Sequence, residues 1–258
     1  MKYTVQALKS GTFQVPGPEV YWMENWNRRE EMNIILYLVR SGNQNILINT
    51  GAPQDLRIMN QAWLSFFGYP EAQITRAENE LPQNLLQPYG LTPDDITTVI
   101  VTPLQAYATA NIPLFRNATI CISRRGWIED FQAPTYHLHV PRHLRIPPDV
   151  NHYLQNEGWE KVRLLEDEEE ILPGLRTFWA GVHHRSSLAV CIDTAAGTVI
   201  LTDCFFKYGN IEKNRYLGVM ESMMEADATW KRIRKEADIY ASIYDPEVFE
   251  RHPGGVLA

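Results

Sequence analysis

Residues 99–115 read VIVTPLQAYATANIPLF. The β-branched run at 99–102 predicts a buried strand, and Pro103 marks the start of the loop into which that strand delivers the chain. Many hydrolases place metal ligands at such a strand end, yet no residue from Pro103 to Ala108 is a good metal ligand. This segment therefore has the position of a hydrolase site without the usual ligands.

The size and charge of the chain limit what surrounds this segment. A chain of 258 residues is long enough for one α/β domain over residues 1–258. The net charge is −7 and no basic stripe is present, which argues against a nucleic-acid partner. The start, MKYTVQALKSGTF, lacks the apolar core of a signal peptide, and no run of about 18 apolar residues follows. We expect a cytoplasmic protein that does not enter a membrane.

Apolar segments alternate with turns and helices along the rest of the chain. Strands are predicted at 33–39, 45–48, 96–101, 119–123, 188–193, 198–202 and 238–243. Helical spacing of apolar residues predicts helices at 54–67 and at about 218–237, and a capped turn at 91–95. Three cysteines, Cys121, Cys191 and Cys204, lie within apolar stretches and are expected to be buried free thiols. Two strand-rich halves that each close with a helix predict a layered α/β sandwich.

Five ordered motifs resemble the metallo-β-lactamase superfamily, and within it the N-acyl homoserine lactonase group. They are ILINTGAP at 46–53, the strand and loop at 99–115, VHHRSSLAVCIDT at 182–194, LTDCFFKYGNIE at 201–212 and YDPEV at 244–248. Together they cover roughly residues 33–255. The resemblance implies an α/β fold of the αββα four-layer sandwich type, with the site along the rim where the strands end.

The chemistry of that family depends on an HxHxDH motif, whose side chains hold one or two divalent ions that activate a bound water. The matching positions here are Pro103, Gln105, Tyr107 and Ala108. By the same resemblance, His183 stands at a ligand of the GHTPGH motif, Asp203 at the bridging carboxylate, and Tyr244 at the final histidine. Because two ligands remain of seven, we expect no two-metal centre of the family type and no cofactor.

A rebuilt metal site is one alternative, and a single divalent ion would then bind. The segment YHLHVPRH at 136–143 would present His137 and His139 on one face if it is extended, and these could join His183 and Asp203. The competing interpretation is a solvated loop or pocket wall whose histidines form hydrogen bonds.

The segment His183–Ser187 provides the groups that acid–base chemistry needs. His183 and His184 are candidate general bases, Arg185 is a candidate cation for a carboxylate or oxyanion, and the two serines are hydrogen-bond donors. Asp203 is expected to orient His183 and fix its tautomer. Tyr107 and Tyr244 are candidate proton donors. The structural alternative is that these residues only satisfy the loop's own backbone.

Candidate substrate-binding residues come from the same motifs and from the N-terminal aromatic segment. Gln105 belongs to the loop, and Phe206 stands where the lactonases often carry a tyrosine that faces the substrate. Trp22 and Trp26, in PGPEVYWMENWNRR, line a pocket or form a subunit contact. Both interpretations stay open, and the second would make the protein a homodimer.

Three classes of function remain on the sequence alone. The first, which we favour, is an enzyme of lactonase-like ancestry that hydrolyses a small ester, lactone or related carbonyl compound with altered or absent metal dependence. The second is a hydrolase with a rebuilt metal site, and the third is a non-catalytic ligand-binding or assembly protein that retains the fold. Fold alone does not choose among them.

Overall fold

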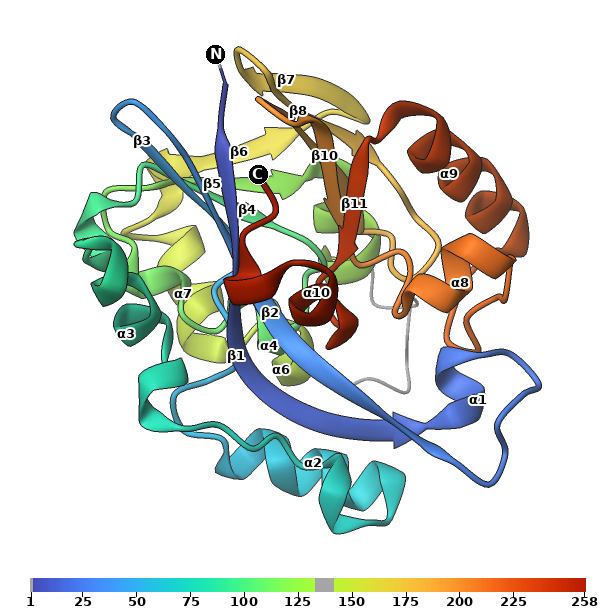
Figure 1. Ribbon diagram of the computed structural model, residues 1–258. Helices are drawn as coiled ribbons and strands as arrows, with labels where there is room; N and C mark the ends of the chain where they lie inside the picture. The colour runs from blue at the N-terminus through green and yellow to red at the C-terminus, as the bar shows by residue number, and fades with distance from the viewer. Residues whose placement is uncertain (1, 133–141) are drawn as a thin grey trace.

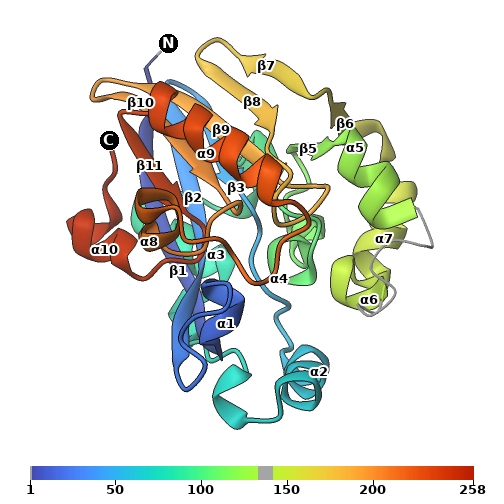
Figure 2. The same cartoon turned by 90° about the vertical axis from the view of Figure 1, so that its right-hand side faces the viewer.

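Two β-sheets stand face to face at the centre of the molecule, and helices cover the outer face of each (Figures 1 and 2). The structure is a computed structural model that describes residues 2–132 and 142–258. In these ranges, no helix has both the length and the apolar character needed to cross a membrane.

The first sheet has the strand order β1-β2-β3-β4-β5-β6. Its strands are β1 (Thr4–Pro16), β2 (Arg29–Ser41), β3 (Gln44–Ile48), β4 (Thr98–Val101), β5 (Thr119–Ser123) and β6 (Val162–Leu165). Strands β1 to β3 are antiparallel, whereas β3 to β6 run parallel. Because parallel strands end at the same edge, Asn49 after β3 and Thr102 after β4 lie at one rim of the sheet.

The second sheet has the order β11-β10-β9-β8-β7. Its strands are β7 (Glu168–Leu172), β8 (Leu175–Trp179), β9 (Leu188–Thr194), β10 (Gly197–Thr202) and β11 (Ile239–Ser242). Strand β9 starts at the rim where the antiparallel β10 and its parallel neighbour β11 end. The segment before β9, Asp203 after β10 and Tyr244 after β11 therefore meet at one place.

The helices are short except for two. They are α1 (Gly17–Val20), α2 (Arg57–Phe67), α3 (Pro82–Leu86), α4 (Ala106–Thr109), α5 (Arg124–Gly126), α6 (Arg142–Arg145), α7 (Pro148–Gln155), α8 (Tyr208–Lys213), α9 (Met223–Glu236) and α10 (Glu247–Arg251). A π-helical turn lies at Trp127–Gln132, and 3₁₀ turns lie at Pro70–Ala72, Glu78–Glu80, Gln87–Tyr89, Pro93–Asp95, Ile112–Leu114, Trp159–Lys161 and Pro253–Gly255.

The alternation of side chains along β2 produces the layers. Ile35, Tyr37 and Val39 belong to the core between the two sheets, whereas Leu36 and Leu38 belong to a second core under the helices of the first sheet. Helix α9 covers the far side of the second sheet, as Figure 2 shows. The resulting order of helices, sheet, sheet and helices confirms the predicted αββα sandwich.

Several predicted elements are correct and several were missed. Both predicted hairpins form, and all three cysteines are buried and free. Strand β1 was not predicted, because a register shift between Lys9 and Thr12 breaks its alternation. Strands β6 to β8 were also missed. The second predicted helix begins at Met223 rather than near residue 218, since the Ser222 side chain caps it by accepting from the Glu225 amide.

A hydrogen bond that crosses between the sheets gives a test of the packing. The buried Tyr37 hydroxyl on β2 donates to the Ser242 carbonyl on β11 at 2.5 Å. Tyr37→Phe should lower the free energy of unfolding by about 1–2 kcal/mol, because it removes a buried hydrogen bond. Urea denaturation measures this loss. Tyr89→Phe is the matched control, since the Tyr89 hydroxyl forms no hydrogen bond with another described residue; an equal loss in both variants would contradict the account.

Candidate functional site

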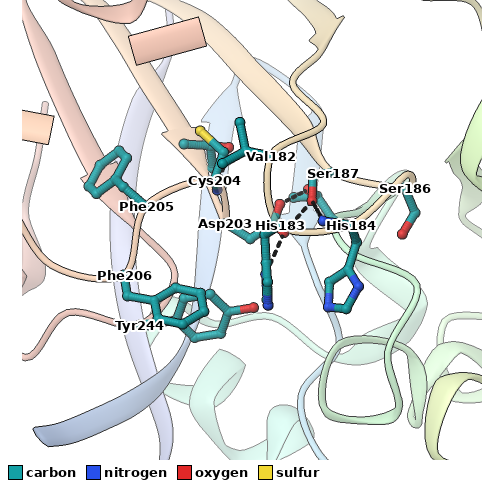
Figure 3. A network of polar contacts seen from close by, with 12 residues as sticks. Val182, His183, His184, Ser186, Ser187, Asp203, Cys204, Phe205, Phe206 and Tyr244 are labelled. Atoms are coloured by element: carbon teal, nitrogen blue, oxygen red, sulfur yellow. Dashed lines mark hydrogen bonds and ion pairs between the residues drawn. The ribbon is translucent and has the colours of Figure 1, made fainter. Parts of the chain in front are cut away.

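A buried carboxylate stands at the rim where the two sheets meet. Asp203, which directly follows β10, has no exposed surface. Its Oδ1 accepts a hydrogen bond from the Thr102 hydroxyl at 2.6 Å, and its Oδ2 accepts one from the Ser187 hydroxyl at 2.5 Å. His183 Nδ1 lies 3.2 Å from the same Oδ2 (Figure 3). Three donors from two sheets therefore satisfy Asp203.

The contact with Asp203 fixes the orientation of the His183 ring. A carboxylate accepts hydrogen bonds, so Nδ1 carries the proton in the neutral imidazole and Nε2 keeps its lone pair. The ring points away from Asp203 toward the side of the site where Phe206 and Tyr244 lie (Figure 3). Phe206 meets the imidazole edge to face, with ring centroids 4.7 Å apart. Only 8% of His183 is exposed, which limits access of bulk water to the ring.

The loop that carries His183 is anchored on both sides. The Ser186 amide donates to Asp130 Oδ2 at 2.8 Å, and the Ser186 hydroxyl accepts from the Leu104 amide at 2.9 Å. Gly126 permits this docking, because a Cβ at that position would lie 2.2 Å from the Ser186 Cα. The Ser187 hydroxyl also accepts from the His184 amide at 3.0 Å. These contacts hold the histidine pair in place.

Thr102 is held by the amide side chain of Asn49. Asn49 Oδ1 accepts from the Thr102 amide at 2.8 Å, and Asn49 Nδ2 donates to the Thr102 carbonyl at 2.7 Å. A carboxylate lacks the second, donating group. Asn49 also adopts a φ of 63°, which asparagine tolerates better than most residues. Asparagine therefore fits this position, and it places the hydroxyl that reaches Asp203.

Two tyrosines at this rim form a hydrogen bond with each other. The hydroxyl groups of Tyr107, on α4, and Tyr244, after β11, lie 2.9 Å apart. Burial raises the pKa of both phenols well above the ordinary value of 10. Both hydroxyls therefore stay protonated at neutral pH, and the pair presents a proton for donation to a third group.

The side chains at this rim do not fit the two-metal centre that the resemblance implies. Both Asp203 oxygens already accept from protein donors, and the neutral tyrosines are poor metal ligands. Within residues 2–132 and 142–258, no group of three or more His, Cys, Asp and Glu side chains is arranged to hold an ion. His137 and His139, the other members of the rebuilt site, lie outside the described residues. His143, the last residue of the segment at 136–143, lines a different cavity from the one that His183 lines.

An apolar cavity of about 550 Å³ opens beside His183. Six of the predicted site residues line it, namely Gln105, Tyr107, His183, His184, Phe206 and Tyr244. Helix α2 supplies most of the opposite wall through Trp63, Phe66 and Phe67. A largely apolar cavity with a few convergent polar groups is typical of a small-molecule site.

Three predicted substrate-binding residues lie elsewhere. Arg185 is 7% exposed, and its charge is neutralised by ion pairs with Glu221 and Glu225. It does not line the cavity. Trp22 and Trp26 are 50% and 65% exposed and are also outside the lining. The partners of Arg185 lie 36 and 40 residues later in the sequence, and no local motif indicated these pairs.

Sequence reasoning missed one ionisable residue of the cavity. Glu19, on α1, lines it together with His183 and Phe206. Burial raises the pKa of this carboxyl from 4.5 to about 7. Its surroundings in the sequence, PGPEV, contain no catalytic motif, so only the packing of α1 against the rest of the chain brings it to the site.

Comparisons with known proteins identify relatives of similar fold. No protein-family model matches the chain. The N-acyl homoserine lactonases AiiB of Agrobacterium fabrum and Rhizobium rhizogenes are 24% and 25% identical over 219 residues, which span 82% of this chain and 78% of each relative. A solved N-acyl homoserine lactone hydrolase, with N-hexanoyl-L-homoserine bound at its catalytic metal centre, superposes with a TM-score of 0.79 and 19% identity over 97% of both chains.

The chain has the metallo-β-lactamase fold. AidC, a dizinc quorum-quenching lactonase, superposes with a TM-score of 0.67 and 16% identity over 98% of this chain and 89% of AidC. The resemblance to N-acyl homoserine lactonases that the five motifs predicted is thereby confirmed.

The raised pKa of Glu19 predicts how stability depends on pH. Below about pH 4.5 this carboxyl is neutral in both states, and between 4.5 and about 7 only the unfolded chain ionises, so the wild type loses stability as pH rises through that window. Glu19→Gln removes the loss. Urea denaturation at about pH 4 and about pH 8 should show the variant gaining on the wild type only at the higher pH. Glu250→Gln, on the exposed face of α10, should show no such gain.

Proposed function

We propose that this protein is a lactonase-like hydrolase that opens a small, largely apolar ester, lactone or related carbonyl compound without a two-metal centre. The observation that carries the proposal is the His183 imidazole, oriented by the buried Asp203 carboxylate in the wall of the apolar cavity. The similarity to N-acyl homoserine lactonases supports a lactone as the substrate class.

The proposed reaction uses the chain's own acid and base groups. His183 Nε2 takes a proton from a water molecule while the water oxygen forms a bond to the substrate carbonyl carbon. The free proton of the Tyr107 and Tyr244 hydroxyl pair forms a hydrogen bond to the carbonyl oxygen as negative charge develops on it. Collapse breaks the bond to the leaving alkoxide, which takes the proton back from the imidazolium. In a lactone, the acid and the alcohol stay in one molecule.

Asp203 acts through His183 in this scheme. Its hydrogen bond from Nδ1 keeps Nε2 free to accept a proton, and its negative charge favours the imidazolium that forms during attack. The hydroxyls of Thr102 and Ser187 hold the carboxylate in place. Asp203 is thus a positioning residue, and no step requires it to leave its three partners.

A ligand-binding protein without turnover is the second candidate. The observation that favours it is the hydroxyl contact between Tyr107 and Tyr244, in which each phenol has a partner within the chain inside an aromatic-lined cavity. Replacement of His183 distinguishes the two candidates, because only a hydrolase has a turnover rate that the replacement would lower.

The first test of the proposal is kinetic. A screen of lactones, esters and amides identifies a substrate, and His183→Ala should then lower kcat/KM by about two to four orders of magnitude, as expected for loss of a general base. Asp203→Asn should lower it through the wrong tautomer. His152→Ala is the matched control, because this histidine is exposed on α7. Full activity of His183→Ala would eliminate the proposed mechanism, and a wild type without turnover on any of these compounds would favour the binding protein.

The second test concerns metal dependence. Protein dialysed against a chelator should keep its turnover, because both Asp203 oxygens are engaged by protein donors and the tyrosines are neutral. Elemental analysis of the same sample gives the metal content per chain. Two equivalents of zinc, iron or manganese that survive dialysis, or activity that returns only when metal is added, would contradict the proposal.

A further inference from the structure

The cavity beside His183 contains an acid that the proposed hydrolysis does not use. Glu19 sits on α1, which lies at the same end of the molecule as α2 (Figures 1 and 2). Its carbonyl accepts from the Gly218 amide at 2.9 Å and from the Val219 amide at 3.4 Å. Gly218 is required for this contact, since a Cβ there would lie 1.7 Å from the Pro18 carbonyl oxygen. The backbone of Glu19 is therefore held in a fixed place at the cavity wall.

The Glu19 side chain has no counter-charge in the part of the chain that the structure describes. No hydrogen bond or ion pair joins its carboxylate to another described residue, and burial is the cause of its raised pKa. Two arginines of the neighbouring segments pair with other carboxylates, Arg29 with Glu71 at 2.7 Å and Arg215 with Glu24 at 2.5 Å. A half-buried carboxylate without a partner costs free energy that a ligand with a suitable donor would recover.

The charge and shape of the cavity select the kind of donor. Among its described lining residues there is no Lys or Arg, and Glu19 is the sole Asp or Glu. Aromatic rings of β1 and α2 surround the space, chiefly Phe13, Trp63 and Phe67. The faces of aromatic rings attract cations, and a carboxylate beside them adds a full negative charge. An anionic ligand would instead meet repulsion from Glu19.

We propose that the ligand of this cavity carries a protonated amine on an apolar body, with the amine paired to the Glu19 carboxylate and the body packed among the aromatic rings. The inference rests on the proposed function for the place of the reacting carbonyl at His183, and it narrows the substrate class to an ester or lactone that also bears a basic nitrogen. Binding of the amine itself does not require turnover.

The test compares two probes of nearly equal size. Phenethylamine is protonated at about pH 8, whereas phenethyl alcohol is neutral, and calorimetry with the full chain gives Kd for each. The wild type should bind the amine about tenfold more tightly than the alcohol, the size expected for a charge paired near aromatic rings. Glu19→Gln should bind the two probes equally, and Glu19→Asp should keep part of the preference. Glu250→Gln, which removes the same charge from the exposed face of α10, should keep all of it.

Three results would overturn the inference: equal affinity for the two probes in the wild type, an undiminished preference in Glu19→Gln, or no binding of either probe. The outcome is separable from that of the hydrolase proposal. Turnover of neutral lactones without an amine preference would overturn this inference alone. An amine preference that depends on Glu19, in a protein that hydrolyses nothing, would support the inference and remove the hydrolase.

Discussion

The Asp203 carboxylate is the group on which the site depends. A buried carboxylate is costly unless donors surround it, and here three donors come from two separate segments: Thr102 after β4, and His183 and Ser187 in the loop before β9. The Thr102 hydroxyl also accepts from the Leu188 amide at 2.8 Å. One hydroxyl after β4 of the first sheet therefore contacts both β9 and Asp203 of the second sheet. The need to satisfy Asp203 thus holds the rims of the two sheets together and orients His183.

The residues around Asp203 also satisfy their hydrogen bonds within the protein. Asn49 both donates to and accepts from Thr102, which an aspartate would not do, and the tyrosine hydroxyls satisfy each other. The loop at 103–108 contains no good metal ligand, and its residues Gln105 and Tyr107 line the cavity. A connected set of hydrogen bonds runs from Asn49 through Thr102 and Asp203 to His183, and the tyrosine pair lies beside it. The imidazole thereby keeps a free nitrogen beside an apolar space.

The sequence predicted the parts of this arrangement that follow from the order of motifs. The sandwich, both hairpins and the approach of His183 to Asp203 could be anticipated, because strand ends that share a rim bring their loops together. Arg185 could not be placed correctly, since its partners Glu221 and Glu225 come from a later segment and helix. Glu19 gave no signal, because its position depends on a contact between α1 and the backbone near Gly218. Strand β1 was hidden by the irregularity in its own register.

In the proposed mechanism Asp203 orients His183 and does not bind a metal ion, and nitrogen NMR of the His183 imidazole measures this. In the neutral ring the account predicts a proton on Nδ1, with Nε2 unprotonated, and it predicts that equimolar zinc leaves both nitrogen resonances in place. His152, exposed on α7, provides an internal reference in the same spectrum. A proton on Nε2, or a stoichiometric shift of the His183 resonances when zinc is added, would contradict the account.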